Sequence, residues 1–150
     1  MTPKKVIYSV FLIAMFCSCD KNENNAIRLM NGQWNMAELT VNEIQLVDEL
    51  PKIRTYGGEI YDQLLQGAWV IHYSDSSKFF WQFSDKGKTF KLSRISDDLP
   101  NQTTTSLVDQ QTYEYSGSYK VLRRAKDEFV FESSETIGFS GQKVKMILRK

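Results

Sequence analysis

The feature that most constrains the fold of this chain is a two-residue alternation of apolar and polar side chains. It recurs in six segments, at 69–73, 79–84, 90–93, 113–121, 129–132 and 143–149. Such alternation is typical of antiparallel strands with one buried and one solvated face. Turn residues separate the segments at 84–87, 124–127 and 140–141. About seven strands in meander order therefore predict an all-β protein.

Closure of this meander into a small up-and-down barrel is the favoured architecture. Closure removes the exposed edges that a flat sheet of this size would present. A sandwich of two sheets stays open as the alternative, because period-two strands alone do not distinguish the two arrangements.

Two connections interrupt the strand pattern. In the first, over 47–66, apolar residues at Ile60, Tyr61, Leu64 and Leu65 predict a short amphipathic helix over 59–66, ended by Gly67 as a left-handed cap. The second, over 96–110, is polar and poor in strand-forming residues.

The first residues of the chain predict export. Lys4 and Lys5 precede an apolar run over 6–16, and the small residue Ser18 separates Cys17 from Cys19. A basic start, a short apolar run and small residues are the pattern of a cleaved signal peptide. The apolar run is about half the length needed to cross a bilayer as a helix.

This N-terminal pattern resembles the lipobox of bacterial lipoproteins, in which cleavage falls just before a cysteine that carries a diacylglycerol. Cys19 is the expected lipidated residue, with Cys17 as its competitor, and Phe16 stands where such signals usually carry Leu. The resemblance implies a signal peptide over 1–18, a flexible tether over 19–27 and a folded domain over 28–150. It implies attachment to the envelope of a Gram-negative bacterium, with the outer membrane expected and its face left open.

Charge argues against nucleic-acid binding, and cysteine content excludes a disulfide within the folded domain. The full chain has 19 basic and 18 acidic residues, and the signal removes Lys4 and Lys5, so the mature chain is close to neutral. Nucleic-acid binders usually carry a strongly basic face, so no nucleic acid is expected as a partner. Both cysteines lie within the first 19 residues, so the folded domain forms no internal disulfide.

The folded part begins with Leu29, Gly32 and Trp34 in a Leu-x-x-Gly-x-Trp pattern. This start, followed by a meander, resembles the lipocalin-like proteins of the calycin group. The resemblance implies that Trp34 closes one end of the barrel against a basic side chain of the last strand, for which Arg149 is the candidate. A second Gly-x-Trp at Gly67 and Trp69 leaves open which tryptophan holds the family position.

An enzyme is not expected. His72 is the only histidine, and no serine stands in a Gly-x-Ser-x-Gly context. With no cysteine in the folded domain, a His/Cys zinc site cannot form, so neither a metal nor a cofactor is expected. The acid pairs at 97–98 and 59/62 are interpreted as solvated side chains.

Aromatic residues supply the candidate ligand site. Eight of them would converge inside a barrel: Trp69, Tyr73, Phe79, Trp81, Phe83, Tyr113, Tyr115 and Tyr119. They either pack as a filled core or line a cavity for one small apolar ligand. The inward tyrosines favour a wet or liganded cavity, because their hydroxyl groups need hydrogen-bond partners.

The sequence therefore predicts a lipid-anchored, non-catalytic, lipocalin-like lipoprotein that binds a small apolar ligand or an envelope partner. The alternative is a surface accessory protein that binds carbohydrate or protein through an exposed aromatic patch.

Overall fold

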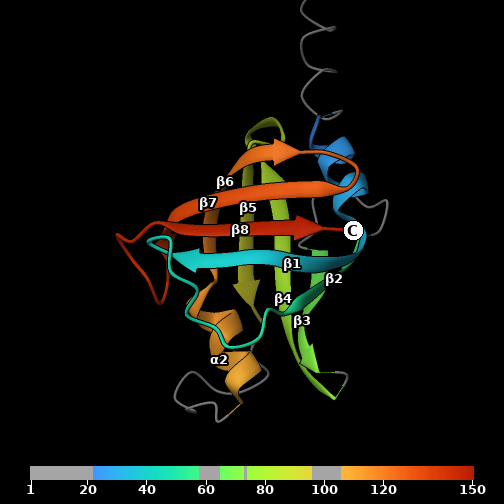
Figure 1. The fold of residues 1–150 in the computed structure, drawn as a ribbon. Helices are drawn as coiled ribbons and strands as arrows, with labels where there is room; N and C mark the ends of the chain where they lie inside the picture. Colours follow the sequence, from blue (N-terminus) through green and yellow to red (C-terminus); the bar gives the residue numbers. More distant parts are fainter. Residues whose placement is uncertain (1–21, 58–64, 73, 96–105) are drawn as a thin grey trace, which may run out of the picture.

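The computed structural model describes residues 22–57, 65–72, 74–95 and 106–150. Eight antiparallel strands close into a barrel in sequence order, which confirms the predicted meander and decides against the sandwich (Figure 1). The strands are β1 (Gly32–Val41), β2 (Lys52–Tyr56), β3 (Leu65–His72), β4 (Asp75–Ser84), β5 (Thr89–Arg94), β6 (Gly117–Arg124), β7 (Glu128–Thr136) and β8 (Val144–Arg149). Residues 22–30 are helical, η1 is a 3-10 turn at Asp85–Gly87, and α2 is an α-helix at Leu107–Glu114.

Closure comes from pairing of the first and last strands, from Asn35 opposite Arg149 to Val41 opposite Val144. A register shift between Met36 and Glu38 interrupts this pairing. Because alternate residues face opposite sides of a sheet, one extra residue changes which positions point inward. The buried positions of β1 accordingly change from Trp34 and Met36 to Leu39 and Val41.

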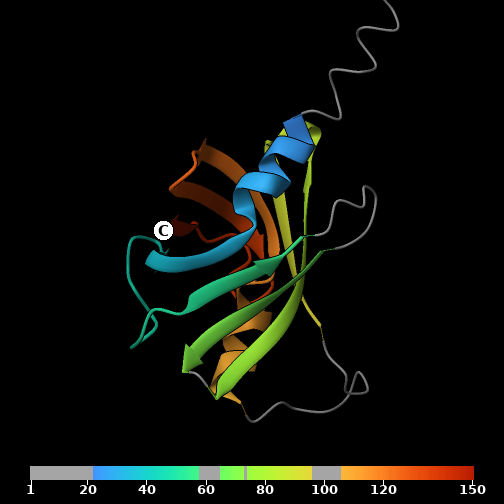
Figure 2. The same cartoon turned by 90° about the vertical axis from the view of Figure 1, so that its right-hand side faces the viewer.

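The barrel has two different ends. At the Trp34 end lie the helical residues 22–30, the β4–β5 turn, the β6–β7 turn and the last residues of β8 (Figure 2). At the other end, which we call the mouth, lie the loop 42–51, the β3–β4 turn, α2 and the loop 137–143. The two helical segments therefore cover opposite ends of the barrel.

Aromatic side chains fill the interior. Phe90 packs on Phe131 with ring centroids 4.6 Å apart, and Phe83 packs on Phe90 at 5.2 Å. Phe129 stacks on Phe131 at 5.5 Å, and all of these side chains are buried. Offset and edge-on ring contacts of this kind stabilise a core beyond the area that they bury.

At the Trp34 end, Lys150 takes the place expected for Arg149. The Lys150 Nζ lies 4.7 Å from the centre of the Trp34 ring, whereas Arg149 is exposed and its Nε lies 2.8 Å from Glu128. Strand alternation explains the correction: Leu148 is buried, so Arg149 points outward and Lys150 returns to the inner side. The Trp34 ring also packs edge-on against Phe129 at 5.2 Å.

The helix-capping role predicted for Gly67 is wrong, because Gly67 lies inside β3 and has no positive φ. A Cβ atom at Gly67 would lie 2.5 Å from Phe79 Cζ and 2.8 Å from the Arg54 carbonyl oxygen. Gly32 instead has a φ of +120°, so the two Gly-x-Trp segments use glycine for different reasons. Residues 58–64 lie outside the described residues, so most of the helix predicted over 59–66 is untested.

Two further segments differ from the sequence prediction. Tyr113 belongs to α2 and Tyr115 directly follows it, whereas the alternation predicted a strand through both. The polar residues 22–27, expected as part of a tether, are helical together with 28–30. Ala26 and Met30 of this helix are buried against the barrel.

Candidate binding site at the barrel mouth

Helix α2 lies across the mouth and is fixed there by its buried face. Val108 and Thr112, one turn apart, are fully buried. Asp109 makes an ion pair with Arg94 at 2.6 Å, and the Ser77 hydroxyl donates a hydrogen bond to Asp109 at 2.7 Å. These bonds tie the first turn of α2 to β4 and β5.

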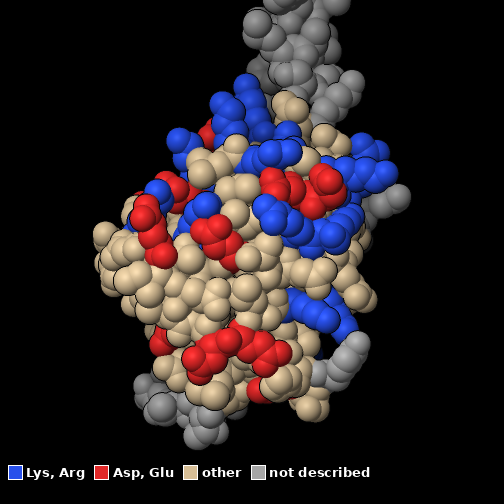
Figure 3. Space-filling view, in the orientation of Figure 1, with Lys and Arg blue, Asp and Glu red and all other residues tan. Residues whose placement is uncertain are grey.

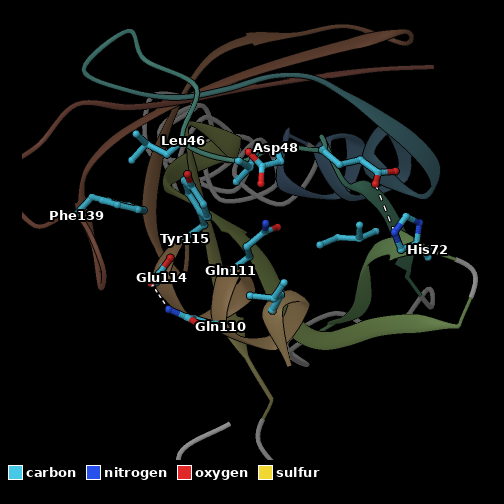
Figure 4. A pocket seen from close by; sticks show the side chains of 12 residues that line it. Leu46, Asp48, His72, Gln110, Gln111, Glu114, Tyr115 and Phe139 are labelled. Carbon is cyan, nitrogen blue, oxygen red and sulfur yellow. Dashed lines mark hydrogen bonds and ion pairs between the residues drawn. The ribbon is translucent and has the colours of Figure 1, made fainter. Parts of the chain in front are cut away.

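A pocket of about 480 Å³ lies at the mouth, and we call it the mouth pocket. Its lining comes from the loop 42–51, the end of β3, α2 and the loop 137–143: Leu46, Val47, Asp48, Glu49, Ile71, His72, Leu107, Gln110, Gln111, Glu114, Tyr115 and Phe139. This volume lies within the range of small-molecule sites in proteins. Figure 4 shows the Tyr115 side chain directed from the α2 side towards the loop that carries Leu46.

Tyr115 is the inner wall of the mouth pocket. Its ring stacks on Trp69 at a centroid distance of 5.8 Å and contacts Phe139 at 5.0 Å. The residue is 1% exposed, yet its hydroxyl group has no hydrogen-bond partner in the described part of the chain. Burial, with a smaller contribution from the Glu114 carboxylate, raises the pKa of Tyr115 to about 12. The hydroxyl group therefore stays protonated at neutral pH and can donate a hydrogen bond.

Exposed apolar side chains gather on the segments at the mouth, and we call them the rim: Ile44, Leu46, Leu107, Tyr113 and Ile137. Of these, Leu46 and Leu107 line the mouth pocket itself. Leu107 is 72% exposed and Ile44 is 62% exposed. In the described residues, the other large apolar side chains with comparable exposure are Tyr56 and Leu122, which lie away from the mouth. Concentration of exposed apolar surface around one pocket is typical of a binding site.

The charges that line the mouth pocket are negative. Asp48, Glu49 and Glu114 contribute carboxylates, and the lining includes neither Lys nor Arg. His72 Nε2 lies 3.5 Å from Glu49, with both side chains more than half exposed. The pocket thus combines apolar walls, a buried hydroxyl donor and an acidic edge.

The structure separates the eight aromatic residues predicted to line a cavity. Trp69, Phe79, Trp81, Phe83 and Tyr119 are buried in the barrel interior, where they fill the core. Tyr119 donates its hydroxyl hydrogen bond to the Tyr115 carbonyl oxygen at 2.5 Å, and burial raises the pKa of Tyr119 above its usual value. Tyr73 lies outside the described residues, and of the seven that are described only Tyr115 lines the mouth pocket.

Tyr113 corrects the prediction of an inward strand residue. It is exposed on α2, and the Arg94 guanidinium carbon lies 4.9 Å from the centre of its ring. Tyr113 is exposed because this segment is helical and not a strand. Val108, Thr112 and Tyr115 are spaced by four and three residues and therefore share the buried face. That spacing is the signal that could have found α2 from the sequence.

The apolar lining residues Leu46, Val47, Ile71, Leu107 and Phe139 were not predicted. They come from two loops, the end of β3 and the start of α2, which are far apart in the sequence. Cys19 also lies outside the described residues.

In the described ranges, no group of three or more His, Cys, Asp or Glu side chains is placed to hold a metal ion. None of the helices in those same ranges is long and apolar enough to cross a membrane.

Comparison with known proteins gives only a distant structural likeness. No protein-family model and no curated protein sequence matches the chain. Among solved structures, the chain is similar to a redesigned beta barrel, at 11% sequence identity and a TM-score of 0.46. The match covers 83% of this chain and 94% of that chain.

Proposed function

We propose that this protein is a lipid-anchored, lipocalin-like barrel of a Gram-negative envelope that binds a small apolar ligand in the mouth pocket, without catalysis. The observation that carries the proposal is the Tyr115 hydroxyl group, which is buried and unpartnered at the wall of an apolar-rimmed pocket.

The unpartnered hydroxyl group favours an occupied pocket. A buried donor without an acceptor costs about 1–3 kcal/mol, and an acceptor atom on a ligand removes that cost. The rim also favours an occupied pocket, because a ligand that covers exposed apolar area gains roughly 25 cal/mol of binding free energy per Å² buried. The chemistry of the site thus favours a molecule with an apolar body and one hydrogen-bond acceptor.

The acidic edge narrows the ligand class further. Asp48, Glu49 and Glu114 would repel the carboxylate of a fatty acid, and the lining includes neither Lys nor Arg to compensate. A neutral or positively charged head group is therefore favoured over an anionic one.

Membrane attachment rests on the sequence of the first nineteen residues. Cys19 follows a basic start, an apolar run and a small residue. Burial of acyl chains contributes about 0.8 kcal/mol per methylene, so a cysteine that carries a diacylglycerol, with two acyl chains, gives stable attachment.

The rim favours an apolar ligand over carbohydrate. Four of its five members are aliphatic, and the Arg94 guanidinium covers one face of the Tyr113 ring. A sugar-binding surface needs flat aromatic faces that are free to stack. An envelope protein that docks on the rim would use the same apolar surface.

The test is native mass spectrometry of residues 20–150, secreted into the envelope of the parent bacterium and purified without detergent. The expected result is an added mass that disappears on denaturation. Leu107→Glu places a charge on the rim and should remove the added mass, whereas Leu122→Glu, at an exposed apolar position away from the mouth, should retain it. A bare polypeptide mass, together with no saturable binding of 1-octanol or octylamine, would refute the proposal.

A further inference from the structure

Charge is divided between the two ends of the barrel. Segments at the Trp34 end carry eight basic residues, Arg28, Lys86, Lys88, Arg123, Arg124, Lys126, Arg149 and Lys150, and four acidic residues, Glu23, Asp85, Asp127 and Glu128. Segments at the mouth carry six acidic residues, Glu43, Asp48, Glu49, Asp75, Asp109 and Glu114, and two basic residues, Lys143 and Arg94, of which Arg94 is paired with Asp109. Figure 3 shows most Lys and Arg side chains in the upper part of the molecule, with some acidic side chains among them, and a band of acidic side chains near the lower end.

A depression of about 410 Å³ lies at the Trp34 end, and we call it the basic depression. Its lining consists of Asn22, Lys86, Gly87, Lys88, Val121, Leu122, Arg123 and Arg124, so half of the lining residues are basic and none is acidic. Leu122 is exposed, which adds an apolar contact surface between the cations.

Part of this positive charge is not neutralised by neighbouring carboxylates. Arg123 lies 3.1 Å from Glu128, but Glu128 also accepts a contact from Arg149 at 2.8 Å, so one carboxylate serves two guanidinium groups. Arg124 donates to the Asn22 carbonyl oxygen at 3.1 Å rather than to an acid. Neither Lys86 nor Lys88 makes a side-chain ion pair within the described residues.

The basic depression lies close to the expected attachment point. Asn22, which lines it, follows Cys19 by three residues. Three residues of extended chain span about 10–11 Å, so an acylated Cys19 holds the headgroup layer within that distance of the depression. This distance is comparable to the Debye length at physiological salt, so attraction between the cations and anionic headgroups remains effective.

We propose that the basic depression binds the phosphate groups of anionic phospholipids, so that the barrel rests on the membrane by its Trp34 end and directs the mouth pocket away from it. The orientation rests on the proposed attachment at Cys19, whereas headgroup binding is a property of the folded barrel alone. An acyl anchor combined with a basic patch is a known way to hold a protein at a membrane. The acidic mouth would be repelled by the same surface.

The test is co-sedimentation of residues 20–150, which carry no cysteine, with vesicles of phosphatidylcholine alone or with roughly 30% phosphatidylglycerol. At about 50 mM NaCl, the partition coefficient on anionic vesicles should exceed that on neutral vesicles by about tenfold, and about 500 mM NaCl should abolish the difference. Equal binding to both kinds of vesicle would overturn the proposal.

Matched variants localise the effect. Lys86→Gln with Lys88→Gln should lower partition on anionic vesicles by about fivefold or more, because it removes two cations from the depression. Lys143→Gln with Lys145→Gln removes the same charge elsewhere on the barrel, where both lysines form ion pairs, and should change partition by less than about twofold. Equal losses in the two variants would show that net charge, not the depression, determines binding.

A second measurement does not depend on variants. Amide hydrogen exchange on anionic vesicles should slow at 84–88 and 121–124 and stay unchanged at 107–115, and protection centred on α2 would contradict the proposal. Because these experiments use neither an acylated cysteine nor a pocket ligand, their outcome is independent of whether the lipoprotein and ligand proposals hold.

Discussion

At the scale of single residues, Tyr115 connects the core to the mouth pocket. Its ring stacks on Trp69 and belongs to the core, while the residue also lines the pocket and its buried hydroxyl group has no partner in the described residues. A purely structural role would be served by phenylalanine, which packs as well and leaves no donor unsatisfied. The retained hydroxyl group is the strongest local sign of binding.

The raised pKa of Tyr115 gives a prediction for stability at high pH. The folded-state pKa is about 12 and the unfolded value is about 10, so the folded state holds the Tyr115 proton more tightly than the unfolded state. The stability that this difference contributes is complete below about pH 10 and is lost as the pH rises from about 10 to about 12. When the pH is raised from about 9.5 to about 11, the free energy of unfolding should fall in both proteins. The fall should be about 1 kcal/mol smaller in Tyr115→Phe than in the wild type, because the variant has no hydroxyl group to ionise. Urea denaturation at both pH values measures this, with Tyr56→Phe, an exposed tyrosine, as the control. Equal losses in wild type and Tyr115→Phe would contradict the assignment.

Trp34 should be the residue that most stabilises its end of the barrel. Its Nε1 donates to the Met30 carbonyl oxygen at 2.7 Å, and its ring contacts both Phe129 and Lys150. Trp34→Ala removes a fully buried ring and should lower the free energy of unfolding by about 3–5 kcal/mol. Tyr56→Ala, on an exposed ring, should cost much less in the same denaturation experiment. A melting temperature equal to that of the wild type would show that Trp34 does not close the barrel.

At the scale of elements, α2 determines whether the mouth pocket exists. The helix supplies one wall of the pocket, and its first turn is held by Asp109 through Arg94 and Ser77. The Trp69 indole N–H donates to the Gln111 side chain at 3.3 Å and ties the next turn to the core. Attachment of α2 is therefore polar at its start and apolar along its buried face.

Asp109→Ala should loosen this helix. It leaves the Arg94 guanidinium, whose side chain is 17% exposed, without its carboxylate and should cost about 1.5–3 kcal/mol. Amide hydrogen exchange over 107–114 should become faster, and the affinity for a pocket ligand should fall. Gln110→Ala, at an exposed position of the same helix, should leave exchange unchanged; because Gln110 lines the mouth pocket, it is a control for exchange and not for ligand affinity. Unchanged exchange in Asp109→Ala would mean that the ion pair does not fix α2.

The elements also show what the sequence could and could not predict. The strands were predictable because large apolar residues such as Phe79, Trp81 and Phe83 recur at every second position, and each is buried. Helix α2 was missed because Tyr113 and Tyr115 fit the strand period over a short window, although Val108, Thr112 and Tyr115 fit the helical one.

The mouth pocket could not be predicted in the same way. It forms where Leu46, Ile71 and Phe139 meet, and such contacts between distant segments leave no local period in the sequence. The sequence prediction placed Arg149 instead of Lys150 on the Trp34 ring because the alternation of β8 continues one residue beyond the end of the strand.

At the scale of the whole molecule, the two ends of the barrel differ in charge and, in the proposed orientation, one faces the membrane and the other faces away from it. The Trp34 end is basic and lies next to the expected attachment site, and the mouth is acidic with an apolar rim. A ligand site directed away from the membrane would be open to molecules or partners in the surrounding compartment.

Membrane attachment is testable in the parent bacterium. Cys19→Ala should move the protein from the membrane fraction to the soluble envelope fraction, because it removes the only residue expected to carry acyl chains. Cys17→Ala is the matched control and should leave the protein on the membrane. Continued retention of the Cys19→Ala variant after a high-salt wash would overturn the assignment of the lipidated residue.

The central claim is that the interior of the barrel is filled and that binding occurs at the mouth. The most direct measurement is an amide chemical-shift map of residues 20–150 during titration with 1-octanol. The account predicts saturable shifts at 44–49, 107–115 and 137–139, the segments that form the mouth pocket and its rim. Saturable shifts centred on interior residues such as Phe83 and Phe129, with none at the mouth, would contradict it.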